Sequence, residues 1–244
     1  DYMTYGGIYR DVRLEVKEKV SLSDIFVHTA IDFSSSPVTA QITSEITLTA
    51  SDENVTIRQY YMPKSTAATQ ESWRLLCEQT VSADASCDKE LSLTATITAP
   101  LLWDTEEANL YILKTQLYQD NALLDETETT FGIREAVFKK DGFYLNGRKL
   151  MIRGLNRHQS FPYVGYAMPK SMQRLDADLL KKELGLNAVR TSHYPQSHYF
   201  LERCDELGLL VFTEFPGWQH IGDDAWKAQA VANAEDMIRQ YRNH

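Results

Sequence analysis

The spacing of apolar residues changes once along this chain, near Gly132, and the change separates two kinds of structure. Before it, apolar or β-branched side chains occupy every second position, as in the run from Ile25 to Phe33. This period of two is typical of β-strands with one buried face. After it, segments with helical periodicity alternate with short apolar runs. We therefore expect a β-domain followed by an α/β domain.

The first part contains enough alternating segments for a complete sandwich. Seven short strands with polar turns between them, over roughly 100 residues, are typical of an immunoglobulin-like β-sandwich. We assign this domain to residues 19–133. The expected strands cover about 25–33, 38–48, 55–62, 73–81, 91–99, 109–118 and 123–132.

The stretch GGIYRDVRLEV precedes this sandwich and also alternates, with Ile8, Val12, Leu14 and Val16 as its apolar positions. One strand cannot form a domain by itself. We expect it to be either an extra edge strand of the sandwich or the last strand of a domain that lies upstream.

The second part begins with a hairpin pattern at 139–148, which contains both Asp-Gly and Asn-Gly turns. Short apolar strands are expected at 150–155, 187–190 and 209–213. Helices are expected between and after them: one that ends at Gly185, one capped by Ser197 that ends at Gly208, and one over 224–241. Their predicted apolar stripes are Met172, Leu175, Leu179 and Leu180; Tyr199, Phe200, Cys204 and Leu207; and Trp226, Val231, Ala234 and Ile238.

Strands that alternate with helices predict a parallel sheet, in either an open doubly wound sheet or a (β/α)8 barrel. Both bind ligands at the carboxyl ends of the strands. The polar side chains of this part gather at those ends, which predicts a polar pocket. Candidate binding residues are Asn156, Arg157, His158, Arg190, His193, Glu214 and Trp218.

Each candidate also has a purely structural interpretation. Arg190 can form a buried ion pair with Glu214, and as a single residue this is the better interpretation. His193 can be a core histidine with satisfied hydrogen bonds, Arg157 and His158 can be loop residues, and Trp218 can be a packing residue. Polar groups at three successive strand ends favour the pocket over these separate explanations.

Composition excludes several function classes. The net charge of −9 would repel phosphate backbones, so nucleic acid is not an expected partner. Apolar runs are too short to span a bilayer, and no membrane segment or targeting signal is expected. Three cysteines without C-x-x-C spacing indicate free thiols rather than a metal site, although Cys77 and Cys87 remain a possible pair. Nucleotide, zincin and serine-hydrolase motifs are absent, so we expect no cofactor and no bound metal.

Several stretches together resemble glycoside hydrolase family 2, the β-galactosidase, β-glucuronidase and β-mannosidase group. They are GGIYRDVRLEV, LLWDTEEANLYIL, FGIREAVFKKDGFYLNGRKLMIRGLNRHQ, NAVRTSHYP and GLLVFTEFPGW. The resemblance covers nearly the whole chain. It implies that residues 1–18 are the last strand of a jelly-roll sugar-binding domain, that 19–133 are the immunoglobulin-like domain, and that 134–244 are the first three βα units of a TIM barrel.

The family's chemistry implies a retaining glycosidase with two catalytic glutamates about 5 Å apart. In the family both lie after the third barrel strand, so we expect no catalytic residue in this chain and no turnover by residues 1–244 alone. Gln159, Ser160 and Phe161 depart from the family's further histidines. Trp218 stands in place of a magnesium-binding glutamate, so no magnesium site of that type is expected.

The resemblance implies an oligosaccharide or glycoside as the substrate, and it is compatible with a homo-oligomer. The family's role in glycan degradation favours a periplasmic or extracellular location over a cytoplasmic one. Two alternatives stay open from the residues alone: a noncatalytic carbohydrate-binding or interaction module, and an open-sheet ligand-binding domain.

Overall fold

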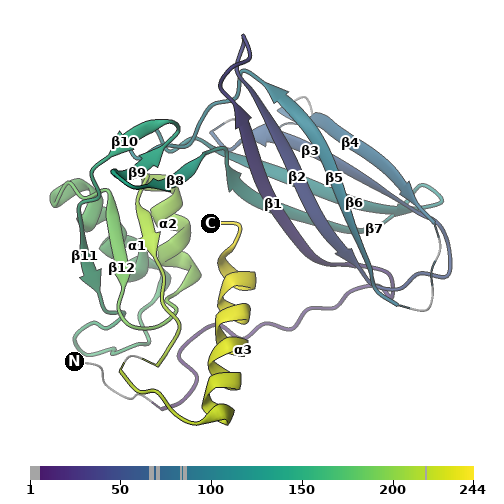
Figure 1. Cartoon of the computed structure of the whole chain (residues 1–244). Coiled ribbons are helices and arrows are strands. Elements are labelled where there is room, and N and C mark those ends of the chain that lie inside the picture. The colour runs from purple at the N-terminus through teal and green to yellow at the C-terminus, as the bar shows by residue number, and fades with distance from the viewer. Residues whose placement is uncertain (1–5, 66–68, 70–71, 83, 85–86, 218) are drawn as a thin grey trace.

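A computed structural model describes residues 6–65, 69, 72–82, 84, 87–217 and 219–244. The chain forms a β-sandwich, a small antiparallel sheet and a parallel α/β unit (Figure 1). Among the described residues, no helix is both long and apolar enough to cross a bilayer.

Seven strands form the predicted sandwich. One sheet has the order β1-β2-β5 and the other β4-β3-β6-β7, with antiparallel neighbours throughout. Period two is confirmed: along β2, Ala40, Ile42, Ile46 and Leu48 are buried at every second position together with Ser44. The strands are β1 (Leu22–Asp32), β2 (Thr39–Leu48), β3 (Val55–Pro63), β4 (Arg74–Val81), β5 (Lys89–Thr98), β6 (Leu110–Gln119) and β7 (Ala122–Gly132).

A polar cluster lies inside this apolar core. Gln59 is fully buried, accepts a hydrogen bond from Ser44 at 2.8 Å and donates one to Thr115 at 3.0 Å. The Cys77 thiol also donates to Gln59, and its burial raises the pKa of the thiol. No disulfide joins Cys77 to Cys87.

A three-stranded antiparallel meander links the sandwich to the α/β unit. It consists of β8 (Ala136–Lys139), β9 (Gly142–Leu145) and β10 (Arg148–Leu150). The predicted Asn-Gly turn connects β9 to β10, with φ of 50° at Asn146 and 74° at Gly147. The hairpin prediction was therefore correct but too short by one strand.

The single strand predicted at 150–155 is wrong. Leu150 ends β10 in the antiparallel meander, and β11 (Gly154–Arg157) begins a separate parallel sheet. Between them the Asn187 side chain accepts from the Arg153 amide at 2.7 Å and donates to the Met151 carbonyl at 2.9 Å. These bonds redirect the chain from one sheet to the other. An apolar run alone does not reveal such a change of partner.

The parallel sheet has the order β11-β12-β13, with β12 at Ala188–Thr191 and β13 at Leu210–Phe212. Gly154 is required at the closest approach of the first two strands, because an added Cβ would lie 2.6 Å from the Ala188 carbonyl oxygen. The helices are α1 (Lys170–Asp178), which continues as the π-helix η2 (Leu179–Glu183), then α2 (His198–Leu207) and α3 (Asp224–Tyr241).

Helix ends follow the predicted caps, but two predicted apolar stripes are wrong. The α2 helix is capped by Ser197 and ends at the left-handed Gly208, as expected. In α1, Gln173 and Ala177 are buried, whereas Leu175 and Leu179 are exposed. The buried Gln173 accepts a hydrogen bond from Arg157. The buried side of α1 is therefore the one that carries Gln173 and Ala177, not the predicted apolar stripe. In α3, Val231 and Ile238 are exposed, and Tyr241 is the buried residue.

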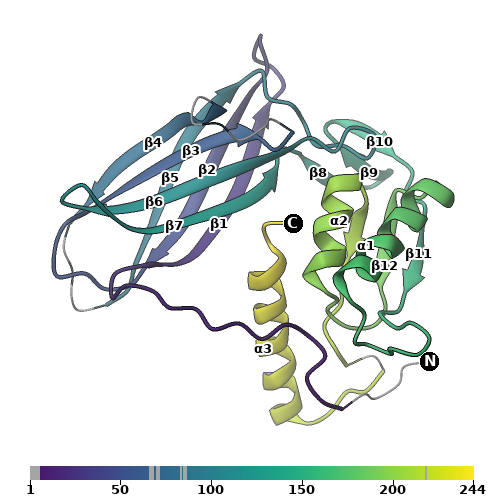
Figure 2. The same cartoon turned by 180° about the vertical axis from the view of Figure 1, so that it is seen from behind.

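Residues 6–18 form no strand, so the alternative of an extra edge strand of the sandwich is wrong, whereas their assignment to the last strand of an upstream domain stays a prediction. Ile8, Val12, Leu14 and Val16 are each more than three-quarters exposed. The segment extends from the sandwich to the α/β unit (Figure 2), where the Arg10 guanidinium donates to the Pro195 carbonyl at 2.7 Å. Alternation supplies one apolar face, but a strand also needs a neighbouring strand to satisfy its backbone.

Candidate functional site

Strands β11, β12 and β13 are parallel, so their carboxyl ends lie at the same end of the sheet, and three predicted residues meet there. Figure 1 labels β11 and β12. The Arg190 guanidinium forms an ion pair with Glu214. His193 Nδ1 lies 3.3 Å from the other Glu214 carboxylate oxygen. The ion pair expected from the sequence is thus present. It does not bury Arg190, whose side chain is 42% exposed.

Strand register decides which predicted residues share this face. Asn156 pairs with Arg190, and Arg190 pairs with Phe212, so these three side chains lie on one face of the sheet. Asn156 is exposed beside Arg190. Arg157 pairs with Thr191 and lies on the opposite face, toward the helices.

Arg157 is therefore not a pocket residue, and this part of the site prediction is wrong. Its side chain is 6% exposed, and its guanidinium stacks 3.9 Å from the centre of the Phe200 ring. It donates to Asp176 at 2.7 Å and to the side chains of Gln173 and Gln196. Burial lowers the pKa of the guanidinium, and the Asp176 carboxylate opposes that shift. Consecutive residues of a strand face opposite sides of the sheet, so Asn156 and Arg157 cannot both face the same pocket.

His158 follows β11 and lies beside the cluster, with its ring 5.3 Å from the His193 ring in an edge-on arrangement. Its Nδ1 is buried and has no hydrogen-bond partner among the described residues. Burial lowers the pKa of His158, and the neighbouring His193 lowers it further. A neutral imidazole offers one donor and one acceptor, which suits a hydroxyl ligand.

One predicted residue remains, and it lies two positions before His220 in the segment after β13. Trp218 lies outside the described residues. His220 is exposed and packs edge-on against the Trp226 ring at 5.8 Å. The described part of the chain contains no group of three or more His, Cys, Asp or Glu side chains able to hold a metal ion.

Sequence reasoning missed the polar residues behind the cluster. Gln159 is buried, and its side-chain oxygen accepts from the Ser197 amide at 2.6 Å, which helps to start α2. Gln196 is fully buried and bonds Arg157. Gln159 and Gln196 both lie in loops, and no local sequence pattern indicates that their side chains are buried. Their burial becomes visible only when the helices are packed.

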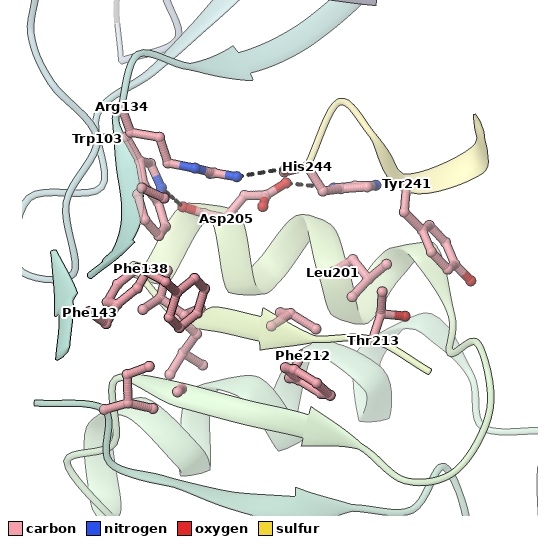
Figure 3. Close-up of a pocket in the computed structure, with 16 residues that line it drawn as sticks. Trp103, Arg134, Phe138, Phe143, Leu201, Asp205, Phe212, Thr213, Tyr241 and His244 are labelled. Carbon is pink, nitrogen blue, oxygen red and sulfur yellow. Dashed lines mark hydrogen bonds and ion pairs between the residues drawn. The ribbon is translucent and has the colours of Figure 1, made fainter. Parts of the chain in front are cut away.

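A concavity lies along the edge strand β13, apart from the candidate site. It has a volume of about 420 Å³ and an apolar lining that includes Phe138, Phe143 and Phe212 (Figure 3). Arg134 crosses its rim to donate to the His244 carbonyl at 2.8 Å. Its apolar lining offers few groups for a polar ligand, in contrast to the strand ends.

Comparison with known proteins identifies both parts of the fold. The model of the glycosyl hydrolases family 2 matches residues 20–134, and the model of the family's TIM barrel domain matches residues 136–244. The described architecture is therefore an immunoglobulin-like sandwich followed by the first three βα units of a TIM barrel. In the described part, β11 and β13 are the edges of the parallel sheet.

Relatives with assigned names span the whole chain. A β-galactosidase of Thermoanaerobacterium thermosulfurigenes is 46% identical over 244 residues, which are 100% of this chain and 33% of the relative. A putative β-glucuronidase of Formosa agariphila is 35% identical and is covered to 28% of its length.

Solved structures agree with these relatives. The structure of Bacteroides uniformis β-glucuronidase 2, covalently bound to cyclophellitol-6-carboxylate aziridine, superposes with a TM-score of 0.85 at 28% identity, over 98% of this chain and 29% of that one. The chain spans about a third of the length of the curated relatives it matches. By these matches over both of its parts, the chain belongs to glycosyl hydrolase family 2.

Proposed function

We propose that this chain is part of a retaining glycoside hydrolase that cleaves terminal β-glycosidic bonds, as a β-galactosidase does. The observation that carries the proposal is the cluster of Arg190, His193 and Glu214 at the carboxyl ends of the parallel strands. Barrel enzymes of this architecture bind their substrates at that end. The longer polypeptide that contains this chain is called the whole protein.

The cluster is suited to binding sugar hydroxyl groups. Glu214 engages Arg190 through one carboxylate oxygen and His193 through the other, which fixes the orientation of both side chains. The Arg190 guanidinium has further N–H donors beyond the one that bonds Glu214, and its side chain is 42% exposed. Beside them lie Asn156 and the neutral ring of His158, and each of these side chains offers hydrogen-bond donors and acceptors. We assign substrate binding to these five residues, and Trp218 stays a prediction.

The charge balance of the cluster favours a neutral sugar over a uronic acid. The Arg190 cation is already paired with the Glu214 anion, so the pair carries no net charge for a substrate carboxylate. Burying a carboxylate without a free cation is unfavourable. The β-galactosidase names of two close relatives support the same substrate class.

The bond-breaking groups are proposed to lie outside these residues. A retaining mechanism uses two carboxyl groups about 5 Å apart, one as nucleophile and one as acid/base. Glu214, the acidic residue of the cluster, is held by Arg190 and His193 and so serves to orient them rather than to attack the sugar. Residues 1–244 are thus expected to bind the sugar face without cleaving the glycosidic bond.

Hydrolysis of nitrophenyl glycosides tests this proposal directly. The whole protein should release nitrophenol from the β-galactoside faster than from the β-glucuronide, and residues 1–244 alone should release none. Turnover by residues 1–244 would contradict the placement of the catalytic carboxylates. No turnover by the whole protein on any β-glycoside, together with sugar binding, would instead favour a carbohydrate-binding module.

A further inference from the structure

The loop of residues 192–196, which carries His193, is held by a buried polar network on the far side of the sheet. This loop joins the end of β12 to Ser197, the cap of α2. Its fixed shape matters because His193 must meet Glu214 across the edge of the sheet.

Both ends of the 192–196 loop are bonded to Arg157. At the first end, the Ser192 amide donates to the Arg157 carbonyl oxygen at 3.0 Å. At the last end, the Gln196 side-chain nitrogen donates to the same carbonyl oxygen at 2.7 Å, and the Arg157 guanidinium donates to the Gln196 side-chain oxygen at 2.6 Å. One residue of β11 thus fixes the span of the loop.

Arg157 is itself immobilised. Asp176 and Gln173 on α1 accept from its guanidinium at 2.7 and 2.8 Å, and the Phe200 ring of α2 covers its face. A planar guanidinium with several bonded N–H groups has little freedom to move. Strand β11, helix α1 and helix α2 are therefore joined at the point where the loop is attached.

The outer side of the loop is held by two further donors. The Tyr241 hydroxyl donates to the Gln196 carbonyl oxygen at 2.6 Å, and Arg10 donates to the Pro195 carbonyl oxygen at 2.7 Å. Neither contact involves the Gln196 side chain. Replacing that side chain therefore removes the Arg157 link at the last end of the loop and leaves these two donors and the Ser192 amide bond in place.

We infer that Arg157 and Gln196 are positioning residues that set the orientation of His193 toward the substrate. This inference rests on the proposed function. Removing the Gln196 side chain leaves Arg157 paired with Asp176, so no buried charge is abandoned, and the change is confined to the attachment of the loop. A shift of about 1 Å in a binding group lowers turnover by as much as about 100-fold.

A double-mutant cycle in the whole protein tests the inference, with kcat and KM for a nitrophenyl β-galactoside as readouts. Gln196→Ala should lower kcat/KM by about 10- to 100-fold. In a His193→Ala background the same substitution should have almost no further effect, because its target is already gone.

Arg203→Met is the matched control. Arg203 also lies in the helix layer and binds Asp178 and Glu206, but it does not bond the loop. Both carboxylates keep another cation after the change, Lys182 for Asp178 and Arg174 for Glu206. This variant should unfold at a lower temperature, keep its kcat/KM, and act additively with His193→Ala.

The possible results separate the two ideas. Additive losses for Gln196→Ala and His193→Ala, or an unchanged kcat/KM in folded Gln196→Ala, would overturn the positioning role while the enzyme stays active. No turnover by the unmodified whole protein would overturn the proposed function, and the inference with it.

Discussion

The indole N–H of Trp103, in the sandwich domain, donates to the main-chain oxygen of Asp205 on α2 at 2.7 Å (Figure 3). Trp103 is 1% exposed, and the Arg134 guanidinium stacks on its ring at 4.8 Å. This contact joins two domains that are distant in sequence. Trp103 is one of several contacts between the two domains, and the Asn243 side chain, which bonds the main chain of Val27 and Ile25, is another.

Trp103→Phe should lower the free energy of unfolding by about 1–3 kcal/mol, because a buried carbonyl loses its donor and some ring volume is lost. Trp73→Phe is the control, since the Trp73 ring is only partly buried and contacts Lys114 on the sandwich surface. Denaturant unfolding of both variants measures the difference. Equal stability of the two variants would contradict the role of the junction.

Gly208 has two separate requirements. Its φ of 72° is in the left-handed region, and an added Cβ would lie 2.6 Å from the Thr105 carbonyl oxygen. Gly147 has a similar φ of 74° with open space around it. Gly147→Ala should cost about 1–2 kcal/mol from backbone strain alone. Gly208→Ala should lower the free energy of unfolding by more than that, because the new Cβ would also clash with the Thr105 carbonyl oxygen. Denaturant unfolding compares the two variants, and a loss no larger than that of Gly147→Ala would show that the domains are not packed at Gly208.

The Asp178 carboxylate should make stability dependent on pH in the acid range. Its hydrogen bonds from Arg203, with support from Lys182, lower its pKa from 3.8 to about 2. A depressed pKa contributes stability that is present above the unfolded-state value and is lost as pH falls through the folded-state value. The stability difference between the wild type and Asp178→Asn should therefore shrink from about pH 4 to about pH 2. Denaturant unfolding at several pH values measures it, and a constant difference would be the contrary result.

The sequence predicts the fold well because its signals are local and repeated. Alternation in the sandwich, the Asn146-Gly147 turn and the Ser197 and Gly208 caps each depend on a few neighbouring residues. Polar residues at the strand ends also indicate the site, and the Arg190 and Glu214 ion pair was expected from residue types alone.

The incorrect predictions share one cause. Each one assigns the wrong face of a strand or helix to the buried side. Arg157 differs from Asn156 by one position in register, and that position decides between the pocket and the helix layer. Gln173, rather than Leu175, is buried in α1 because Arg157 needs an acceptor there. Such choices are made by tertiary contacts, and no local pattern encodes them.

Under the proposed function, β12 contributes a sugar-binding side chain, Arg190, to a glycosidase pocket. The most direct measurement is kcat/KM of the whole protein for a nitrophenyl β-galactoside before and after Arg190→Ala. A lost hydrogen bond to a charged group costs about 1.5–3 kcal/mol, so kcat/KM should fall about 10- to 100-fold. The control is Arg148→Ala, which should leave kcat/KM unchanged. Arg148 lies on β10, and its exposed side chain pairs with Asp104, in the segment between β5 and β6. An unchanged kcat/KM in folded Arg190→Ala would contradict the account.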